Sequence, residues 1–128
     1  MILGNKVLQG FLTPCSEDSI REAGLDLKLK ENLVLQPKEF KLIWTKEIIK
    51  LPTKLLAFCN LRSSWARKGI LIPPTIIDPG FEGRIVIEVF NASDNTISIP
   101  SETRFLHVIL AEVNGAIPYC GQYQNQGR

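Results

Sequence analysis

Short apolar runs, each closed by a turn-forming residue, recur along the chain and restrict the folds open to it. From Leu25 the hydrophobic period is two, because Leu25, Leu27 and Leu29 alternate with charged residues, and this predicts a half-buried strand. Proline, glycine and asparagine separate the later runs. Strand-like runs occupy residues 25–30, 33–35, 40–44, 47–51, 55–60, 70–72, 84–90, 96–99 and 105–113. Such spacing of short strands is typical of an all-β sandwich or barrel.

The two ends of the chain depart from this pattern. Residues 1–12 have helix-like spacing at Val7, Leu8 and Phe11, with Asn5 as a possible cap and Pro14 just beyond, which predicts a short N-terminal helix. Residues 15–22 are polar and predicted to be irregular. Residues from about 114 to 128 are rich in Gly, Gln, Asn and Tyr without periodicity, which predicts a loop or a mobile C-terminal arm. We expect one domain over residues 1–128 that ends in this arm.

Composition excludes several classes of partner. A net charge of +2 gives no electrostatic case for nucleic acid as a partner. No apolar run approaches the ~20 residues that a membrane span needs, so no membrane partner is expected. The three cysteines are odd in number and far apart, which fits a reducing cytoplasm better than a disulfide framework. One histidine and no C-x-x-C pair leave no zinc ligand set.

Chemically useful groups concentrate between residues 61 and 91, where Glu88 is the most informative residue. In a strand its side chain shares a face with Val86 and Phe90. A carboxylate between apolar neighbours is costly to bury and tends to have a raised pKa, which suits a general acid or base near neutral pH. The alternative is an edge strand with Glu88 pointing into water, and spacing alone does not separate the two.

Other candidates in this stretch each have a structural alternative. Asp78 opens the turn D-P-G-F, where an aspartate ordinarily caps backbone N–H groups, yet ten residues separate it from Glu88 and one pocket could hold both carboxylates. The run from Arg62 to Arg67 could be a helical N-terminus that binds phosphate, or a surface turn anchored by Trp65.

Several catalytic signatures are absent. His107 lies in an apolar run and is predicted to be a partly buried strand residue rather than a catalytic one. The H-x-E…P-C-x-x-C pattern of zinc-dependent base deaminases is missing, as are G-x-G-x-x-G, P-loop and G-x-S-x-G motifs. Any hydrolysis must therefore use a carboxylate-activated water, with a divalent ion brought by the phosphates of a substrate.

Five motifs along the chain resemble those of the dCTP deaminase/dUTPase superfamily, and the dCTP deaminase branch most closely. They are Ala23-Gly24-Leu25-Asp26-Leu27; R-S-S-x-A-R-x-G at Arg62–Gly69; I-D-P-G-F-x-G at Ile77–Gly83; E-x-x-N at Glu88 and Asn91; and P-Y-x-G-x-Y-x-x-Q from Pro118 to Gln126. Glu88 selects the branch, because deaminases carry their catalytic glutamate there. The resemblance implies a distorted jelly-roll β-barrel that forms a homotrimer, with sites at subunit interfaces.

The same resemblance implies roles for individual residues. Glu88 would take a proton from the water that attacks C4 of cytosine, and Ser63 would help to orient the water or the base. Arg62, Ser64 and Arg67 would hold the triphosphate as its Mg²⁺ complex, with no metal at the base. Asp78 would bind the deoxyribose 3′-hydroxyl, and the arm residues Tyr119, Gln122 and Gln126 would contact the nucleotide.

Departures from the family pattern keep three functions open. The segment between Arg67 and Asp78 is about two residues shorter than in typical deaminases, and Gln122 stands where they usually have a phosphate-binding lysine. The leading hypothesis is a dCTP deaminase, which as a bifunctional enzyme would carry dCTP through to dUMP. The alternatives are a dUTPase, in which Asp78 helps to position water, and a non-catalytic nucleotide-binding regulatory trimer.

Overall fold

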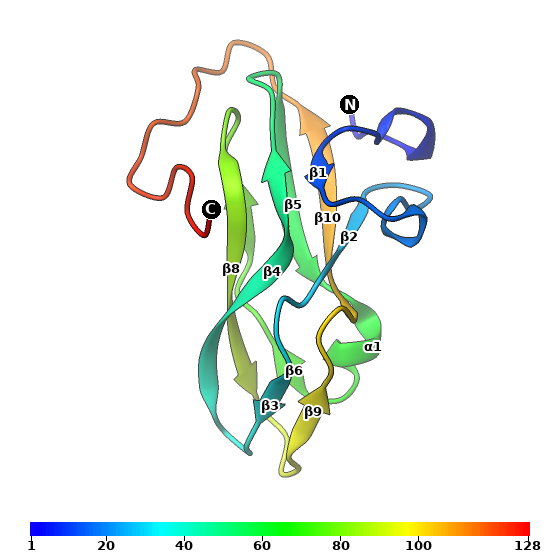
Figure 1. Cartoon of the computed structure of the whole chain (residues 1–128), viewed down its shortest axis with the longest axis vertical. Coiled ribbons are helices and arrows are strands. Elements are labelled where there is room, and N and C mark those ends of the chain that lie inside the picture. The colour runs from blue at the N-terminus through cyan, green and yellow to red at the C-terminus, as the bar shows by residue number, and fades with distance from the viewer.

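The computed structural model describes residues 1–128, and strands dominate it (Figure 1). The strands are β1 (Leu12–Thr13), β2 (Leu25–Lys28), β3 (Leu33–Leu35), β4 (Phe40–Lys50), β5 (Leu55–Leu61), β6 (Ile70–Leu71), β7 (Thr75–Ile77), β8 (Glu82–Asn91), β9 (Ile97–Ile99) and β10 (Arg104–Glu112). Helical structure is limited to α1 (Ser63–Ala66) and two 3₁₀ turns, η1 (Asn5–Val7) and η2 (Glu17–Ser19). The all-β prediction is confirmed. No helix is long and apolar enough to cross a membrane.

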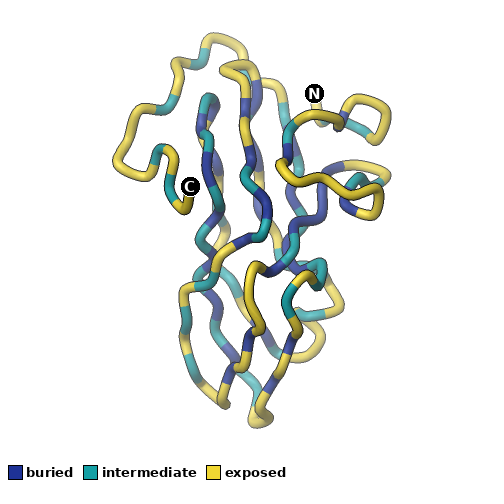
Figure 2. The backbone as a smooth tube through the Cα atoms, viewed as in Figure 1, coloured by how far each residue is buried: buried dark blue, intermediate teal, exposed yellow.

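Three sheets enclose the core. Two four-stranded sheets have the orders β1-β4-β8-β6 and β2-β10-β5-β7, and β3 pairs with β9 in a third. Every pairing between these strands is antiparallel. A single cluster of 24 buried hydrophobic residues fills the interior. In β8 burial alternates strictly, with Ile85, Ile87 and Val89 buried and their neighbours half-buried (Figure 2).

The runs predicted at 40–44 and 47–51 belong to one long strand, β4, with an irregularity between them. The register with β8 shifts between Trp44 and Ile48, where β4 has extra residues relative to its partner. Thr45 is fully buried in this bulge, where its hydroxyl donates to the Glu47 carbonyl at 2.9 Å and accepts the Ile85 N–H at 2.9 Å. The Glu47 side chain is 2 % exposed and accepts the Lys28 N–H at 2.9 Å. Side-chain hydrogen bonds thus replace the missing ladder bonds.

The predicted N-terminal helix is a single 3₁₀ turn, η1, and the residue before it, Gly4, is extended. Asn5 does not cap it; the N-cap is Gly4, and the Asn5 side chain donates instead to the Arg21 carbonyl at 2.9 Å. Ile2 forms a bridge with Ala111, so pairing with β10 overrides the helical spacing of this segment. β1 and β7 were not predicted. β7 directly follows two prolines, which hide so short a strand from pattern reading.

Asn91 closes the end of β8 with a network of side-chain bonds. It is fully buried, and its amide donates to the carbonyls of Leu35 at 3.1 Å, Gln36 at 3.2 Å and Asn95 at 2.8 Å. Its oxygen accepts the Ser93 N–H at 3.0 Å and the Ser93 hydroxyl at 2.7 Å. The asparagine of the E-x-x-N motif therefore holds three loops together at one point.

Candidate active site

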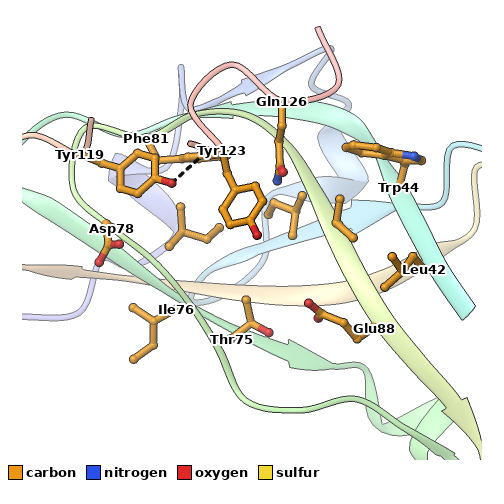
Figure 3. Close-up of a pocket in the computed structure, with 13 residues that line it drawn as sticks. Leu42, Trp44, Thr75, Ile76, Asp78, Phe81, Glu88, Tyr119, Tyr123 and Gln126 are labelled. Carbon is orange, nitrogen blue, oxygen red and sulfur yellow. Dashed lines mark hydrogen bonds between the residues drawn. The ribbon is translucent and has the colours of Figure 1, made fainter. Parts of the chain in front are cut away.

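A pocket of about 710 Å³ opens between β8 and β7, at the seam of the two large sheets. We call it the Glu88 pocket. It is lined by Leu42, Trp44, Thr75, Ile76, Ile77, Asp78, Phe81, Ile85, Val86, Glu88, Tyr119, Tyr123 and Gln126. Apolar walls with a few converging polar groups are the usual composition of a small-molecule site. Figure 3 shows Thr75 and Glu88 on facing strands, with the tyrosines of the arm on the other side of the cavity.

Glu88 is half-buried and lies directly opposite Leu42 in the register of β4 and β8. Its side chain shares the less buried face of β8 with Val86 and Phe90, as the sequence predicted. β8 pairs with β4 along most of its length but with β6 only at Phe90 and Asn91, so one side of β8 is an open edge at Glu88. The Glu88 side chain nevertheless lines the pocket. Apolar neighbours surround the carboxylate, and the pocket gives it access to a bound molecule.

The backbone beside Glu88 also faces the pocket. Along β8 the odd-numbered residues bond toward β4, as the Ile85 N–H does to Thr45. The even-numbered residues face the other side, where the Arg84 N–H donates to the Gln126 carbonyl at 2.9 Å. β6 pairs only from Phe90 onward, so no strand pairs with Val86 and Glu88 on that side. Their N–H and C=O groups can bond a flat polar ligand edge.

Asp78 is exposed at the turn into β8 and lines the same pocket. The turn is closed by its backbone, because the Phe81 N–H donates to the Asp78 carbonyl at 3.2 Å. The carboxylate itself makes no hydrogen bond or ion pair with a protein group, so it does not cap the turn. It is therefore free to accept a hydrogen bond from a ligand hydroxyl.

The C-terminal arm supplies the remaining wall. Tyr119 packs edge-on against Phe81 with ring centroids 5.8 Å apart, and its hydroxyl accepts the Tyr123 N–H at 3.1 Å (Figure 3). Gln126 reaches the pocket from the end of the arm, with its amide donating to the Arg84 carbonyl at 2.9 Å. Gln122 is exposed and does not line the pocket.

The residues predicted to bind phosphate lie elsewhere in the chain. Ser63, Ser64 and Arg67 are exposed on or beside α1, and none of them lines the Glu88 pocket. In Figure 1 α1 and the arm lie on opposite sides of the molecule. Trp65 anchors the helix, since its Nε1 donates to the Arg104 carbonyl at 3.0 Å and its ring stacks on Phe105. Trp65 is thus partly buried against the core, while the hydroxyls and the guanidinium remain at the surface.

Beside α1, four basic side chains surround the Asp26 carboxylate, which is 1 % exposed. Its oxygens lie 3.2 Å from Arg62 Nε, 3.3 Å from Arg104 Nη1, 3.8 Å from Arg21 Nε and 2.8 Å from His107 Nδ1. We call these residues the Asp26 cluster. Glu22 lies 3.9 Å from Arg21 and Asp18 lies 3.9 Å from Arg104, so these carboxylates offset part of the positive charge of the cluster. Arg62 immediately precedes Ser63 and Ser64, whose side chains are exposed. A guanidinium beside two hydroxyls can bond the oxygens of an anion such as phosphate.

Sequence reasoning missed most of this cluster. Asp26 was predicted on the polar side of a half-buried strand, whereas it is buried with its neighbours Leu25 and Leu27. His107 is a partly buried strand residue, as predicted, but its ring nitrogen is bonded to Asp26. A signal existed, because an aspartate enclosed by leucines in A-G-L-D-L needs a cationic partner, but the partner cannot be read from spacing.

The comparison with known proteins decides the family. Residues 27–113 match the sequence profile described as dCTP deaminase-like, which covers most of the chain, including Glu88 and Asp78. The chain belongs to the dCTP deaminase-like family. It is 46 % identical, over 98 % of its length and 94 % of the relative's, to a "probable deoxyuridine 5′-triphosphate nucleotidohydrolase" of Sulfolobus islandicus rod-shaped virus 1. It is 37 % identical to a dCTP deaminase of Pyrobaculum arsenaticum, over 98 % of this chain and 93 % of the relative.

Solved structures of the dCTP deaminase-like family confirm the barrel fold. The chain superposes on the 2′-deoxycytidine 5′-triphosphate deaminase of Agrobacterium tumefaciens with a TM-score of 0.75. The two are 16 % identical, and the match covers 85 % of this chain and 48 % of the other. At this identity the likeness concerns the fold. The relatives and the fold together place this chain among the enzymes of nucleotide metabolism that form the dCTP deaminase/dUTPase superfamily.

The structure contains no group of three or more His, Cys, Asp or Glu side chains that could hold a metal ion. Mg²⁺ commonly binds through substrate phosphates and one or two carboxylates rather than in an all-protein cage. A Mg²⁺ ion brought by the phosphates of a nucleotide would need no such group.

Proposed function

We propose that this protein is a dCTP deaminase, which hydrolyses dCTP to dUTP and ammonia. The observation that carries the proposal is Glu88, a carboxylate on the pocket-facing side of β8 with Leu42 and Val86 beside it. A pocket with apolar walls and one such carboxylate suits a flat base whose polar edge must meet an acid–base group.

In the proposed reaction Glu88 accepts a proton from water while the water oxygen forms a bond to C4 of cytosine. The carboxylic acid then returns this proton to the ring nitrogen N3, which gives a tetrahedral intermediate. Glu88 next transfers the proton of the new hydroxyl to the 4-amino group. This group leaves as ammonia, and C4 becomes the carbonyl carbon of uracil. Ser63 would help to orient the water or the base from a second chain.

Binding of the nucleoside follows from the same pocket. The unpaired N–H and C=O groups of Val86 and Glu88 face the cavity and can bond the polar edge of the pyrimidine. The Asp78 carboxylate has no protein partner, which leaves it to accept the 3′-hydroxyl of the deoxyribose. Tyr119 lies in the same wall, where its ring can pack against the sugar, and Gln126 closes the pocket beside it.

The triphosphate would bind at α1 and the Asp26 cluster. Arg62, Ser64 and Arg67 provide guanidinium and hydroxyl donors there, and Mg²⁺ bound to the phosphates would neutralise part of their charge. Gln122 would contribute a neutral contact from the exposed part of the arm. Because the Glu88 pocket does not include α1, a nucleotide that used both would need two chains.

This arrangement supports a homotrimer with composite sites. The outer face of β4 and β6 exposes Phe40, Leu42 and Leu71, which are 59 %, 62 % and 55 % accessible in the single chain. Contiguous apolar side chains of this size on a sheet face are typical of a subunit interface. Light scattering should give three chains per particle, and a fully active monomer would contradict the proposal. The three free thiols support a reducing, cytoplasmic location.

A dUTP diphosphatase is the second candidate, favoured by the viral relative that is 46 % identical and carries that description. In this case Asp78 would position water against the α-phosphate, and Glu88 would not act as a base. Both activities in sequence would convert dCTP to dUMP, ammonia and pyrophosphate.

One preparation assayed in parallel tests the proposal. Ammonia released from dCTP is the expected result. Pyrophosphate from dUTP with no ammonia from dCTP would overturn it in favour of the diphosphatase. Nucleotide binding with neither product would instead identify a non-catalytic regulatory trimer. Ammonia and pyrophosphate together from dCTP would identify the bifunctional enzyme.

A further inference from the structure

The end of the C-terminal arm is bonded along β8, next to the Glu88 pocket. The Asn125 N–H donates to the Glu82 carbonyl at 2.7 Å, and the Arg84 N–H donates to the Gln126 carbonyl at 2.9 Å. The Glu82 N–H donates to the Gln124 side-chain oxygen at 2.8 Å. These bonds use the side of β8 that no strand pairs with, so the arm occupies a free sheet edge.

Glycines leave room for this close approach. A Cβ atom at Gly83 would lie 2.9 Å from the Gln126 carbonyl oxygen and 3.0 Å from its nitrogen, both backbone atoms that cannot turn aside. At Gly127, where φ is +70°, a Cβ atom would lie 2.9 Å from both Arg84 Cβ and Trp44 Cζ3. The arm is therefore pressed against the strand and against Trp44, a pocket residue.

Arg84 contacts the end of the arm through both its side chain and its backbone. Its guanidinium Nε donates to the Gly127 carbonyl at 2.8 Å, and its own carbonyl accepts the Gln126 amide at 2.9 Å. The same guanidinium donates through Nη1 to the carbonyls of Thr45, at 3.4 Å, and Lys46 in the bulge of β4. One side chain thus fastens the arm to the bulge that follows Trp44. The planar fork of arginine suits this task, whereas lysine, a single point of charge, cannot bond both carbonyl groups in this geometry.

We infer that Arg84 is a positioning residue, which holds the arm over the Glu88 pocket and keeps Tyr123 and Gln126 in its wall. Arg84 does not line the pocket and acts through the residues that do. This inference deepens the proposed function, on which its kinetic consequence rests. Release of the arm removes part of the nucleotide-binding wall and leaves Glu88 in place. It should raise KM for the nucleotide more than it lowers kcat.

The test compares Arg84→Met with Lys50→Met in the full chain. Methionine keeps the apolar stem of Arg84 and removes the donors. Lys50 is exposed on β4, lies 3.7 Å from Glu82 and bonds no arm carbonyl, so Lys50→Met controls for loss of a nearby positive charge. Hydrogen exchange at the Asn125 amide reports arm docking without any need for turnover. Because a charge-assisted bond to the arm is lost, exchange should become at least about tenfold faster in Arg84→Met and stay within about twofold in Lys50→Met.

Unchanged exchange at Asn125 in a folded Arg84→Met protein would overturn the inference. Arg84→Lys provides a second variant if methionine prevents folding, and it should also expose the arm because it cannot reproduce the fork. With an active wild type, KM should rise at least about tenfold in both variants, and an unchanged KM would overturn the kinetic part. A wild type without turnover would refute the proposed function and leave the exchange result to decide the role of Arg84.

Discussion

The buried Asp26 carboxylate lies 3.2 Å from Nε of Arg62, and this ion pair joins the first motif of the chain to its phosphate-binding motif. Arg62 is therefore both a candidate ligand of the triphosphate and a partner of a buried charge. Arg67 in the same motif is exposed and pairs with no carboxylate in the structure. The two arginines should behave differently when they are removed.

Arg62→Ala should weaken nucleotide binding and destabilise the fold, whereas Arg67→Ala should only weaken binding. Each loses charge-assisted bonds to the triphosphate, at a cost of about 1.5–3 kcal/mol per bond. Loss of Arg62 also removes one partner of Asp26 and should lower the free energy of unfolding by about 1–3 kcal/mol. Titration calorimetry with dCTP and urea denaturation would separate the effects. Equal stability of both variants would contradict the structural role of Arg62.

Asn91→Ala should destabilise the protein without acting on chemistry. The variant leaves the Leu35, Gln36 and Asn95 carbonyls and the Ser93 N–H without their side-chain partner, so unfolding should become easier by about 2–4 kcal/mol. Ser93→Ala is the control, because it removes one hydroxyl and keeps the amide bonds of Asn91. Urea denaturation should rank the loss as Asn91→Ala well above Ser93→Ala, and the reverse order would refute this account of the motif.

The strands could be predicted because their pattern is local. Period-two alternation placed Glu88 on the correct face of β8, and turn residues separated most of the runs correctly. The sequence could not predict that β4 is continuous, because the bulge depends on bonds from Thr45 to a strand forty residues away. β7 is too short, and too close to prolines, to give a period.

The candidate site was predictable only in part, for the same reason. Asp78 lies in the turn that leads into β8 and Glu88 lies in β8 itself, so their closeness along the chain brings both to one pocket. The burial of Asp26 depends on Arg104 and His107, about eighty residues away, and charge pairs at that separation leave no spacing signal. Docking of the arm depends on backbone edges and on the absence of side chains at Gly83 and Gly127, which composition does not reveal.

Glu47 should make the free energy of unfolding fall as the pH rises above the ordinary pKa of a carboxyl group. Burial raises the pKa of Glu47 above its ordinary value of 4.5, more than the Lys28 N–H bond lowers it. The folded state then binds this proton more tightly than the unfolded state, so the contribution of Glu47 is lost as pH rises from that ordinary value through the raised one. Glu47→Gln cannot titrate. The difference in unfolding free energy, Gln variant minus wild type, should grow with pH in urea denaturation, and a constant difference would contradict the prediction.

Glu88→Gln separates the candidate activities most sharply. Glutamine keeps the shape and hydrogen-bonding reach of Glu88 opposite Leu42 but cannot accept a proton. If Glu88 is the general base, ammonia release from dCTP should fall by about 10²–10⁴-fold while dCTP affinity changes little. A diphosphatase would respond in the opposite way, because its water is aimed at phosphorus from Asp78. Asp78→Asn would then abolish pyrophosphate release from dUTP, and Glu88→Gln would keep most of it. Ammonia and pyrophosphate measured for both variants distinguish these cases, and an unchanged rate of ammonia release in Glu88→Gln would exclude Glu88 as the base of a deaminase.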